Sequence, residues 1–173
     1  EQYVRDARIA MIYEGANGIQ ALDLVGRKLG LNGGRAVQAF FKEVGEFCED
    51  NRSDEKMAPY TKALKKGLND LQAATMWLMQ NAMQKPENAG AGAHHYLHIL
   101  GIVAPGLMWL RMASAAARML DAGEGDGPYL DAKLTTARFF AERIMPDAGA
   151  LRRKIEGGSD SIMTIDPDLF VSA

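Results

Sequence analysis

The stretch YTKALKKGLNDLQAATMWLMQNAMQKP, residues 60–86, has the clearest helical pattern in the sequence. Its apolar side chains recur every three or four residues, which places them on one face of an α-helix. That face consists of Tyr60, Leu64, Leu68, Leu71, Leu78 and Met83. Lys85-Pro86 ends the pattern, because a residue that precedes proline is disfavoured in the helical conformation. The stretch predicts one long amphipathic helix, with Ser53 or Asp54 as its N-cap.

The same period continues on both sides of this helix. It predicts one helix that follows an N-cap at Asn17. Three more helices are predicted from about Arg35 to Asp50, from about Ala93 to Asp121 and from about Pro128 to Ile144, and short turns then follow as far as Ile155. Segments 30–34, 87–92 and 123–127 are rich in glycine and other small residues and predict loops. Pro105 is expected to kink the helix that contains it.

No run of alternating apolar and polar residues favours a strand. The expected core faces are Ile19, Leu22, Val25 and Leu29; Val37, Phe40, Val44 and Phe47; Leu100, Val103, Leu107, Leu110, Ala117 and Leu120; and Leu130, Leu134, Ala137, Phe140 and Ile144. Helices with such faces and short loops pack most simply side by side. We therefore expect an all-α fold, an antiparallel bundle of four to five helices that follows an N-terminal segment.

The last 17 residues, 157–173, have a different character. Gly157-Gly158-Ser159-Asp160-Ser161 predicts a flexible start, and Asp166-Pro167-Asp168 is incompatible with a helix interior. The segment nevertheless contains the apolar residues Ile162, Met163, Ile165, Leu169 and Phe170. A free tail is rarely so apolar, so we expect an extended tail packed on the bundle or on a neighbouring subunit.

The composition is typical of an ordinary globular protein, with 47% hydrophobic residues, 24% charged residues and a net charge of -2. The charge gives no support to nucleic-acid binding. No uninterrupted apolar stretch reaches the roughly 18 residues of a membrane span. The single cysteine, Cys48, cannot form an internal disulfide and is expected to be buried. Because the chain begins with Glu1 and not methionine, we expect a piece of a longer protein.

The segment RDARIAMIYEGANGIQALDLVGRKL, residues 5–29, contains the main functional candidate. Glu14 follows an apolar stretch and precedes a glycine turn. Two interpretations are open from the residues alone. A carboxylate that leaves an apolar segment is partly desolvated and is a candidate general base, whereas a solvated loop glutamate is the commoner case.

Residue identity and spacing in this segment resemble the signature near the C-terminus of acyl-CoA dehydrogenases. The resemblance covers Arg5-Asp6-Ala7-Arg8-Ile9, then Ile12-Tyr13-Glu14-Gly15, then Asn17, Ile19 and Gln20. The family form is RDAR followed by IYEGTN and IQ. The rest of the chain is similar, in position, length and helical pattern, to the extra C-terminal helical domain of longer bacterial members, a type that includes 3-methylmercaptopropionyl-CoA dehydrogenase.

The resemblance implies a reaction in which an acyl-CoA thioester is oxidised to the 2,3-enoyl-CoA with FAD as the hydride acceptor. It assigns Glu14 as the base that removes the α-proton, with its backbone N–H as a donor to the thioester oxygen. Gly15 would lie against the substrate, because it has no side chain to obstruct the thioester.

Ala16, Asn17 and Gly18 match family positions that contact FAD. The sequence departs from the family at Ala16, where threonine is common, so one hydroxyl donor to the cofactor is lost. The resemblance also implies upstream domains, an acyl-CoA substrate, a homo-oligomer (dimer or tetramer), an electron-transfer flavoprotein as acceptor, and a bacterial cytoplasmic location. It implies neither nucleic-acid nor membrane partners. We expect the piece alone to be inactive.

Three regions follow from this interpretation. Residues 1–32 would end the helical domain common to the family, residues 33–156 would form the additional bundle, and residues 157–173 would be the tail. The alternative is a helical module that acts in oligomerisation or interaction without catalysis. Apolar helix faces fit an assembly interface as well as a core.

Other candidates are weaker. His94, His95 and His98 have a spacing that can bind a metal, but no acidic residue or cysteine accompanies them, so surface or interface histidines are the simpler interpretation. Trp77 and Trp109 are expected in a core or an interface. The basic run Arg152-Arg153-Lys154 is expected to be solvated.

Overall fold

A computed structural model of the chain describes residues 1–12 and 16–170. All regular structure in these residues is helical, which confirms the all-α fold and the helical bundle. The elements are α1 (Gln2–Ile12), α2 (Ala16–Asp23), a π-helical turn η1 (Leu24–Lys28), a 3₁₀ turn η2 (Leu31–Gly34), α3 (Arg35–Asp50), α4 (Ala58–Asn81), α5 (Glu87–Asp121), α6 (Gly127–Phe139), a second π-helical turn η3 (Phe140–Ile144), α7 (Asp147–Glu156), α8 (Asp160–Met163) and a 3₁₀ turn η4 (Pro167–Phe170).

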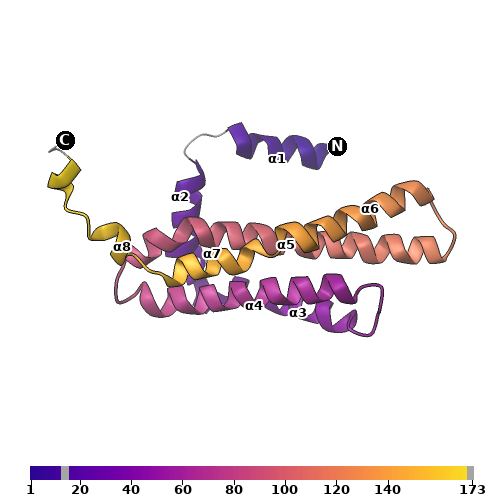
Figure 1. The fold of residues 1–173 in the computed structure, drawn as a ribbon, viewed down its shortest axis with the longest axis horizontal. Helices are drawn as coiled ribbons and strands as arrows, with labels where there is room; N and C mark the ends of the chain where they lie inside the picture. Colours follow the sequence, from indigo (N-terminus) through magenta and orange to yellow (C-terminus); the bar gives the residue numbers. More distant parts are fainter. Residues whose placement is uncertain (13–15, 171–173) are drawn as a thin grey trace.

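The bundle consists of α3, α4, α5 and a fourth segment in which α6, η3 and α7 follow one another. Short loops make successive segments antiparallel (Figure 1). Helix α5 is the central element and packs on α2, α4, α6 and α7. Its buried face includes Tyr96, Ile99, Val103, Leu107 and Leu110, which meet the predicted face of α4 at Leu64, Leu68, Leu71 and Leu78.

Helix α5 is long and apolar enough to cross a membrane by length and composition. In this fold it is instead the helix around which the others pack. It runs without interruption through Pro105. The apolar character of α5 is therefore accounted for by its place in the core.

The predicted loop at residues 87–92 is wrong, because α5 already begins at Glu87. Pro86, with φ of -57°, fits the start of a helix. One of the small residues that suggested a loop, Gly92, lies instead at a close helix contact. A Cβ at Gly92 would lie 3.0 Å from Leu78 Cδ2 and 3.3 Å from Ile155 Cγ2. The short turns expected before Ile155 are also wrong, since α7 is a ten-residue helix.

Some predicted core residues lie outside the core. Met83 follows the end of α4 and is 87% exposed. Ile19 and Leu22 are exposed as well, whereas Ala21 and Leu29 are buried. The π-helical turn η1 changes the number of residues per turn after Asp23, so a constant helical period across this region gives the wrong face.

Two cap predictions also need correction. Helix α2 begins at Ala16, so Asn17 lies inside its first turn and is not its N-cap. Asp54 accepts hydrogen bonds from the backbone N–H groups of Lys56 and Met57 and so caps the turn that precedes α4. Cys48 is buried as expected, and burial raises the pKa of its thiol.

The end of the chain leaves the bundle at Gly158 and runs past the α4–α5 turn (Figure 1). Ile162, Met163, Ile165 and Leu169 are more than half exposed. The single chain therefore does not bury them, and their burial against a neighbouring subunit stays a prediction.

Candidate functional site

The signature segment spans the junction between α1 and α2. Helix α1 ends at Ile12 and α2 begins at Ala16. Glu14 and Gly15, the predicted base and substrate-binding residue, lie outside the described residues. Their assignment stays a prediction, and what the structure gives is the two helices that flank them.

Helix α1 stands apart from the bundle (Figure 1). Its apolar residues Tyr3, Val4 and Ile9 are 90%, 69% and 60% exposed. A helix of a globular protein normally buries such residues against the core. Its polar contacts are local, an ion pair between Arg5 and Glu1 and a hydrogen bond from Gln2 Nε2 to Asp6 Oδ1 of 2.8 Å. The helix thus presents an apolar surface that is available for a partner.

Helix α2 packs across α5, and its first turn borders a small cavity of about 300 Å³. Asn17 contributes one wall, and Leu97, His98, Gly101 and Ile102 of α5 contribute the others. Asn17 and Gly18 are exposed, and a Cβ at Gly18 would meet no atom within 4 Å. Among the described residues no side chain fills the space beside Gly18, so a bound group has room to approach the helix start.

Amide, imidazole and backbone N–H groups, in an uncrowded setting, are the donors that suit the phosphate and ribose groups of a dinucleotide. The residues present at the start of α2 therefore fit the FAD contact expected of Asn17 and Gly18. The structure describes the backbone of Ala16 but not its side chain.

Sequence reasoning did not connect His98 with this cavity. The two walls are far apart in the chain, and only the packing of α2 on α5 brings them together. His98 lies 4.3 Å from His94, measured between ring centroids. The pKa of neighbouring His95 is lowered, mainly by burial, and its buried Nδ1 has no hydrogen-bond partner among residues 1–12 and 16–170. In the described part of the chain no cluster of three or more His, Cys, Asp or Glu side chains is placed to hold a metal ion.

A second cavity, of about 580 Å³, lies between η1 and η2 on one side and the α4–α5 turn on the other. Every residue that lines it is apolar or glycine, and the larger ones are Val25, Leu29, Leu78, Met79 and Met83. We call it the apolar groove. Its chemistry excludes a polar ligand as the main occupant.

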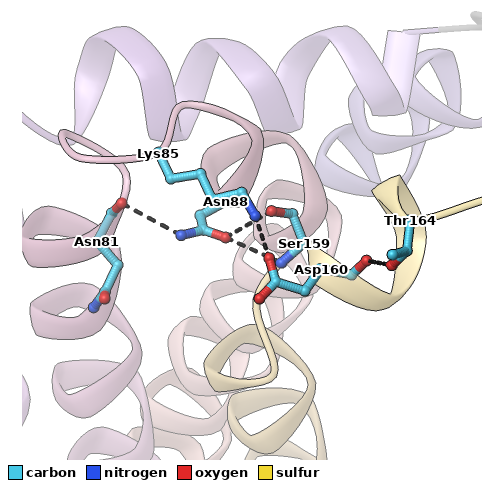
Figure 2. Close-up of polar contacts among 6 residues, drawn as sticks. All are labelled: Asn81, Lys85, Asn88, Ser159, Asp160 and Thr164. Carbon is cyan, nitrogen blue, oxygen red and sulfur yellow. Dashed lines mark hydrogen bonds and ion pairs between the residues drawn. The ribbon is translucent and has the colours of Figure 1, made fainter.

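Next to the apolar groove, the start of the tail is fixed to the bundle (Figure 2). Asn88 Oδ1 accepts hydrogen bonds from Ser159 N at 3.0 Å and from Ser159 Oγ at 2.9 Å. Ser159 is 1% exposed, and Lys85 forms an ion pair with Asp160. Gly158 has φ of +67°, which favours glycine, and so redirects the chain at this point. We call Lys85, Asn88, Ser159 and Asp160 the polar anchor.

The remaining predicted candidates are structural. Trp77 and Trp109 pack partly buried against the core, as expected. Arg152 differs from expectation, because it is half-buried and lies 3.2 Å from the carboxylate of buried Asp70. It joins α7 to α4 and is not simply solvated.

Comparison with known proteins agrees with the fold. A model of the family described as acetyl-CoA dehydrogenase C-terminal like matches residues 40–166. The chain is 34% identical, over 94% of its length, to 3-methylmercaptopropionyl-CoA dehydrogenase of Ruegeria pomeroyi. It is 32% identical, over 98% of its length, to a broad-specificity linear acyl-CoA dehydrogenase of Mycobacterium tuberculosis. A butyryl-CoA dehydrogenase of Syntrophomonas wolfei is 25% identical over 83% of the chain.

The chain spans only 28%, 29% and 24% of these three relatives. The similarity thus concerns one part of a longer enzyme, and it confirms the resemblance to acyl-CoA dehydrogenases. Because the family match extends over most of the chain, from Phe40 to Asp166, this protein belongs to the acetyl-CoA dehydrogenase C-terminal-like family.

Proposed function

We propose that this chain is the C-terminal part of an FAD-dependent acyl-CoA dehydrogenase, which oxidises an acyl-CoA thioester to the 2,3-enoyl-CoA. The observation that supports it most is the family match over residues 40–166, immediately after the signature segment of residues 5–29. Since the relatives are more than three times longer, the flavin-binding core and most of the substrate pocket belong to sequence outside this chain.

In this proposal Glu14 is the general base. Its carboxylate removes the α-proton of the thioester, and the backbone N–H of Glu14 donates to the thioester oxygen as negative charge develops there. Gly15 leaves room for the acyl thioester. In sequence, Glu14 lies between α1 and α2, and the exposed apolar residues of α1 offer a surface on which the upstream domains can pack.

The cofactor edge consists of Ala16, Asn17 and Gly18. Asn17 and Gly18 would hold the flavin dinucleotide through the Asn17 side chain and the backbone N–H groups at the start of α2. When bound, FAD supplies the hydride acceptor. The loss of the family hydroxyl at Ala16 leaves Asn17 as the side-chain donor of this segment.

Glu14→Gln in the longer enzyme tests the base. The amide keeps the size of the side chain but cannot accept the proton. We expect exchange of the α-proton with solvent deuterium to fall by at least about a hundredfold, with FAD still bound. Proton exchange by NMR and the flavin absorption spectrum give the two readouts.

A matched control is Glu55→Gln, the same change at an exposed glutamate in the α3–α4 loop. It should leave exchange and flavin content at the parent values. Exchange that survives in Glu14→Gln at the rate of the Glu55→Gln control would contradict the assignment.

The further expectations are that the whole enzyme is a cytoplasmic homo-oligomer and passes its electrons to an electron-transfer flavoprotein. The alternative, a helical module without catalysis, draws support from the exposed apolar residues of α1 and the tail. The two functions are compatible for residues 33–156. A parent protein without a flavin-binding domain would leave only the second.

A further inference from the structure

The apolar groove has the properties of a docking site that the described chain leaves open. Its volume is about 580 Å³ and every side chain that lines it is apolar. Met79 and Met83, at its margin, are exposed, whereas Leu29 and Leu78 at its base are buried. Flexible methionines around an apolar base are typical of surfaces that accept apolar side chains.

The tail beyond the polar anchor has the complementary property. Ile162, Met163 and Ile165 are 61%, 60% and 52% exposed. Burial of these large apolar side chains against a partner would be favourable, because it removes apolar surface from water. The buried Ser159 fixes the start of this segment near the α4–α5 turn, and the short helix α8 follows it directly, so the first exposed residues are not part of a free coil.

Charge also matches the tail to the groove. Residues 157–173 contain Asp160, Asp166 and Asp168 but no lysine or arginine. Arg27 and Lys28 belong to η1, which forms one wall of the groove, and their side chains are 73% and 53% exposed. Arg35 begins α3 directly after η2, which lines the groove through Gly33. Asp23 pairs with Arg27 and Lys28 and offsets one of these charges. The flank remains basic, so it attracts an acidic segment.

The direction of the chain favours exchange between copies. Gly158 turns the chain, Lys85 pairs with Asp160, and α8 then leads away from the bundle (Figures 1 and 2). A tail held in this way exposes its apolar residues to another molecule. Reciprocal exchange of two tails makes a closed two-fold interface, in which each copy gives a tail and receives one.

We infer that residues 160–166 dock in the apolar groove of a second copy of this chain. The acidic side chain of Asp166 then faces Arg27, Lys28 and Arg35 of that copy, and Ile162 and Ile165 cover its exposed methionines. The contact is an interaction surface between protomers, independent of the proposed base and cofactor residues.

Mixed disulfide formation tests this contact directly. Ile165→Cys and Met83→Cys proteins, one of them with a mass tag, are mixed under mild oxidation. The chain's own Cys48 is buried and serves as the background in the unmodified protein. We expect a disulfide-linked heterodimer. Met108→Cys is the matched control, since Met108 is also an exposed methionine but lies outside the groove, and it should give at least roughly tenfold less product.

Sedimentation equilibrium tests the same contact without a covalent bond. The double variant Ile162→Asp, Ile165→Asp should weaken dimerisation by at least roughly tenfold, because two buried aliphatic side chains are lost. Met108→Asp should leave the dimer unchanged. The substituted residues of both variants are exposed, and circular dichroism checks that each variant retains its helices.

Four results would overturn the inference. The first two are a monomer at every concentration and a dimer that the tail variant does not weaken. The other two are an intramolecular disulfide in the Ile165→Cys, Met83→Cys double variant and, in the longer enzyme, a crosslink from Met83→Cys to upstream sequence. Since no readout involves Glu14 or flavin, a failure here would leave the proposed enzyme function standing.

Discussion

Two hydroxyl groups meet in the core between α4 and α5. Thr75 Oγ1 lies 2.8 Å from the hydroxyl of Tyr96, and both residues are almost completely buried. Burial raises the pKa of Tyr96 from the ordinary 10.0 to about 12, while the bond to Thr75 opposes the rise. The folded state thus holds the phenol neutral where the unfolded chain ionises it.

The pair predicts a pH-dependent loss of stability. The stabilisation is fully present below pH 10.0 and is lost as the pH rises toward about 12. Over that window the parent should lose about 2–3 kcal/mol more than Tyr96→Phe, which has no group to ionise there. Urea unfolding at several pH values measures the difference. Parallel losses in the two proteins would contradict it, since lysines titrate equally in both.

Single residues show where sequence reasoning succeeds. Leu64, Leu68, Leu71 and Leu78 are buried as their spacing predicts. The predicted face also includes Met83, five residues after Leu78, but this residue follows the end of α4, so the predicted face extends too far. Partners across the bundle, such as Thr75 with Tyr96 or Asn17 with His98, have no signal in the sequence, because tertiary packing decides them.

Among the elements, the contact of α4, α5 and η3 depends on two glycines. Met145 is 3% exposed, and a Cβ at Gly67 or Gly106 would lie 2.5 Å from its Cε or 2.8 Å from its Sδ. The glycines of both helices thus form the space that the methionine fills. The sequence predicts α3 at its observed bounds. The glycines near the start of α5 instead suggest a loop, because a glycine at a helix contact cannot be distinguished in sequence from a glycine in a turn.

Met145→Ala should therefore leave a cavity and lower the free energy of unfolding by about 2–4 kcal/mol. The change in the urea midpoint, with an unchanged slope, measures it. Met83→Ala is the matched control, since Met83 is 87% exposed, and it should change stability by no more than about 0.5 kcal/mol. Equal effects of the two substitutions would show that Met145 does not fill this space.

The proposed cofactor edge is incomplete within these 173 residues. The described residues contribute the start of α2 and one wall on α5, while the relatives are more than three times longer. We expect the 173-residue chain to bind FAD too weakly for stoichiometric titration, and the longer enzyme to bind it tightly. Flavin fluorescence compares the two proteins. Stoichiometric quenching by the short chain would contradict the expectation and place the binding determinants within residues 1–173.

The central position of α5 has a consequence for synthesis on the ribosome. Residues 87–121 form a helix apolar enough to enter a membrane, and α6 and α7, which cover it, follow later in the chain. While residues 127–156 are still within the ribosome, the described elements that can cover α5 are α2, η1 and α4. The nascent chain then exposes a long apolar surface of the kind that chaperones bind. A stalled nascent chain that ends near residue 156 is thus the form most prone to aggregate, and emergence of α6 and α7 from the ribosome removes that hazard.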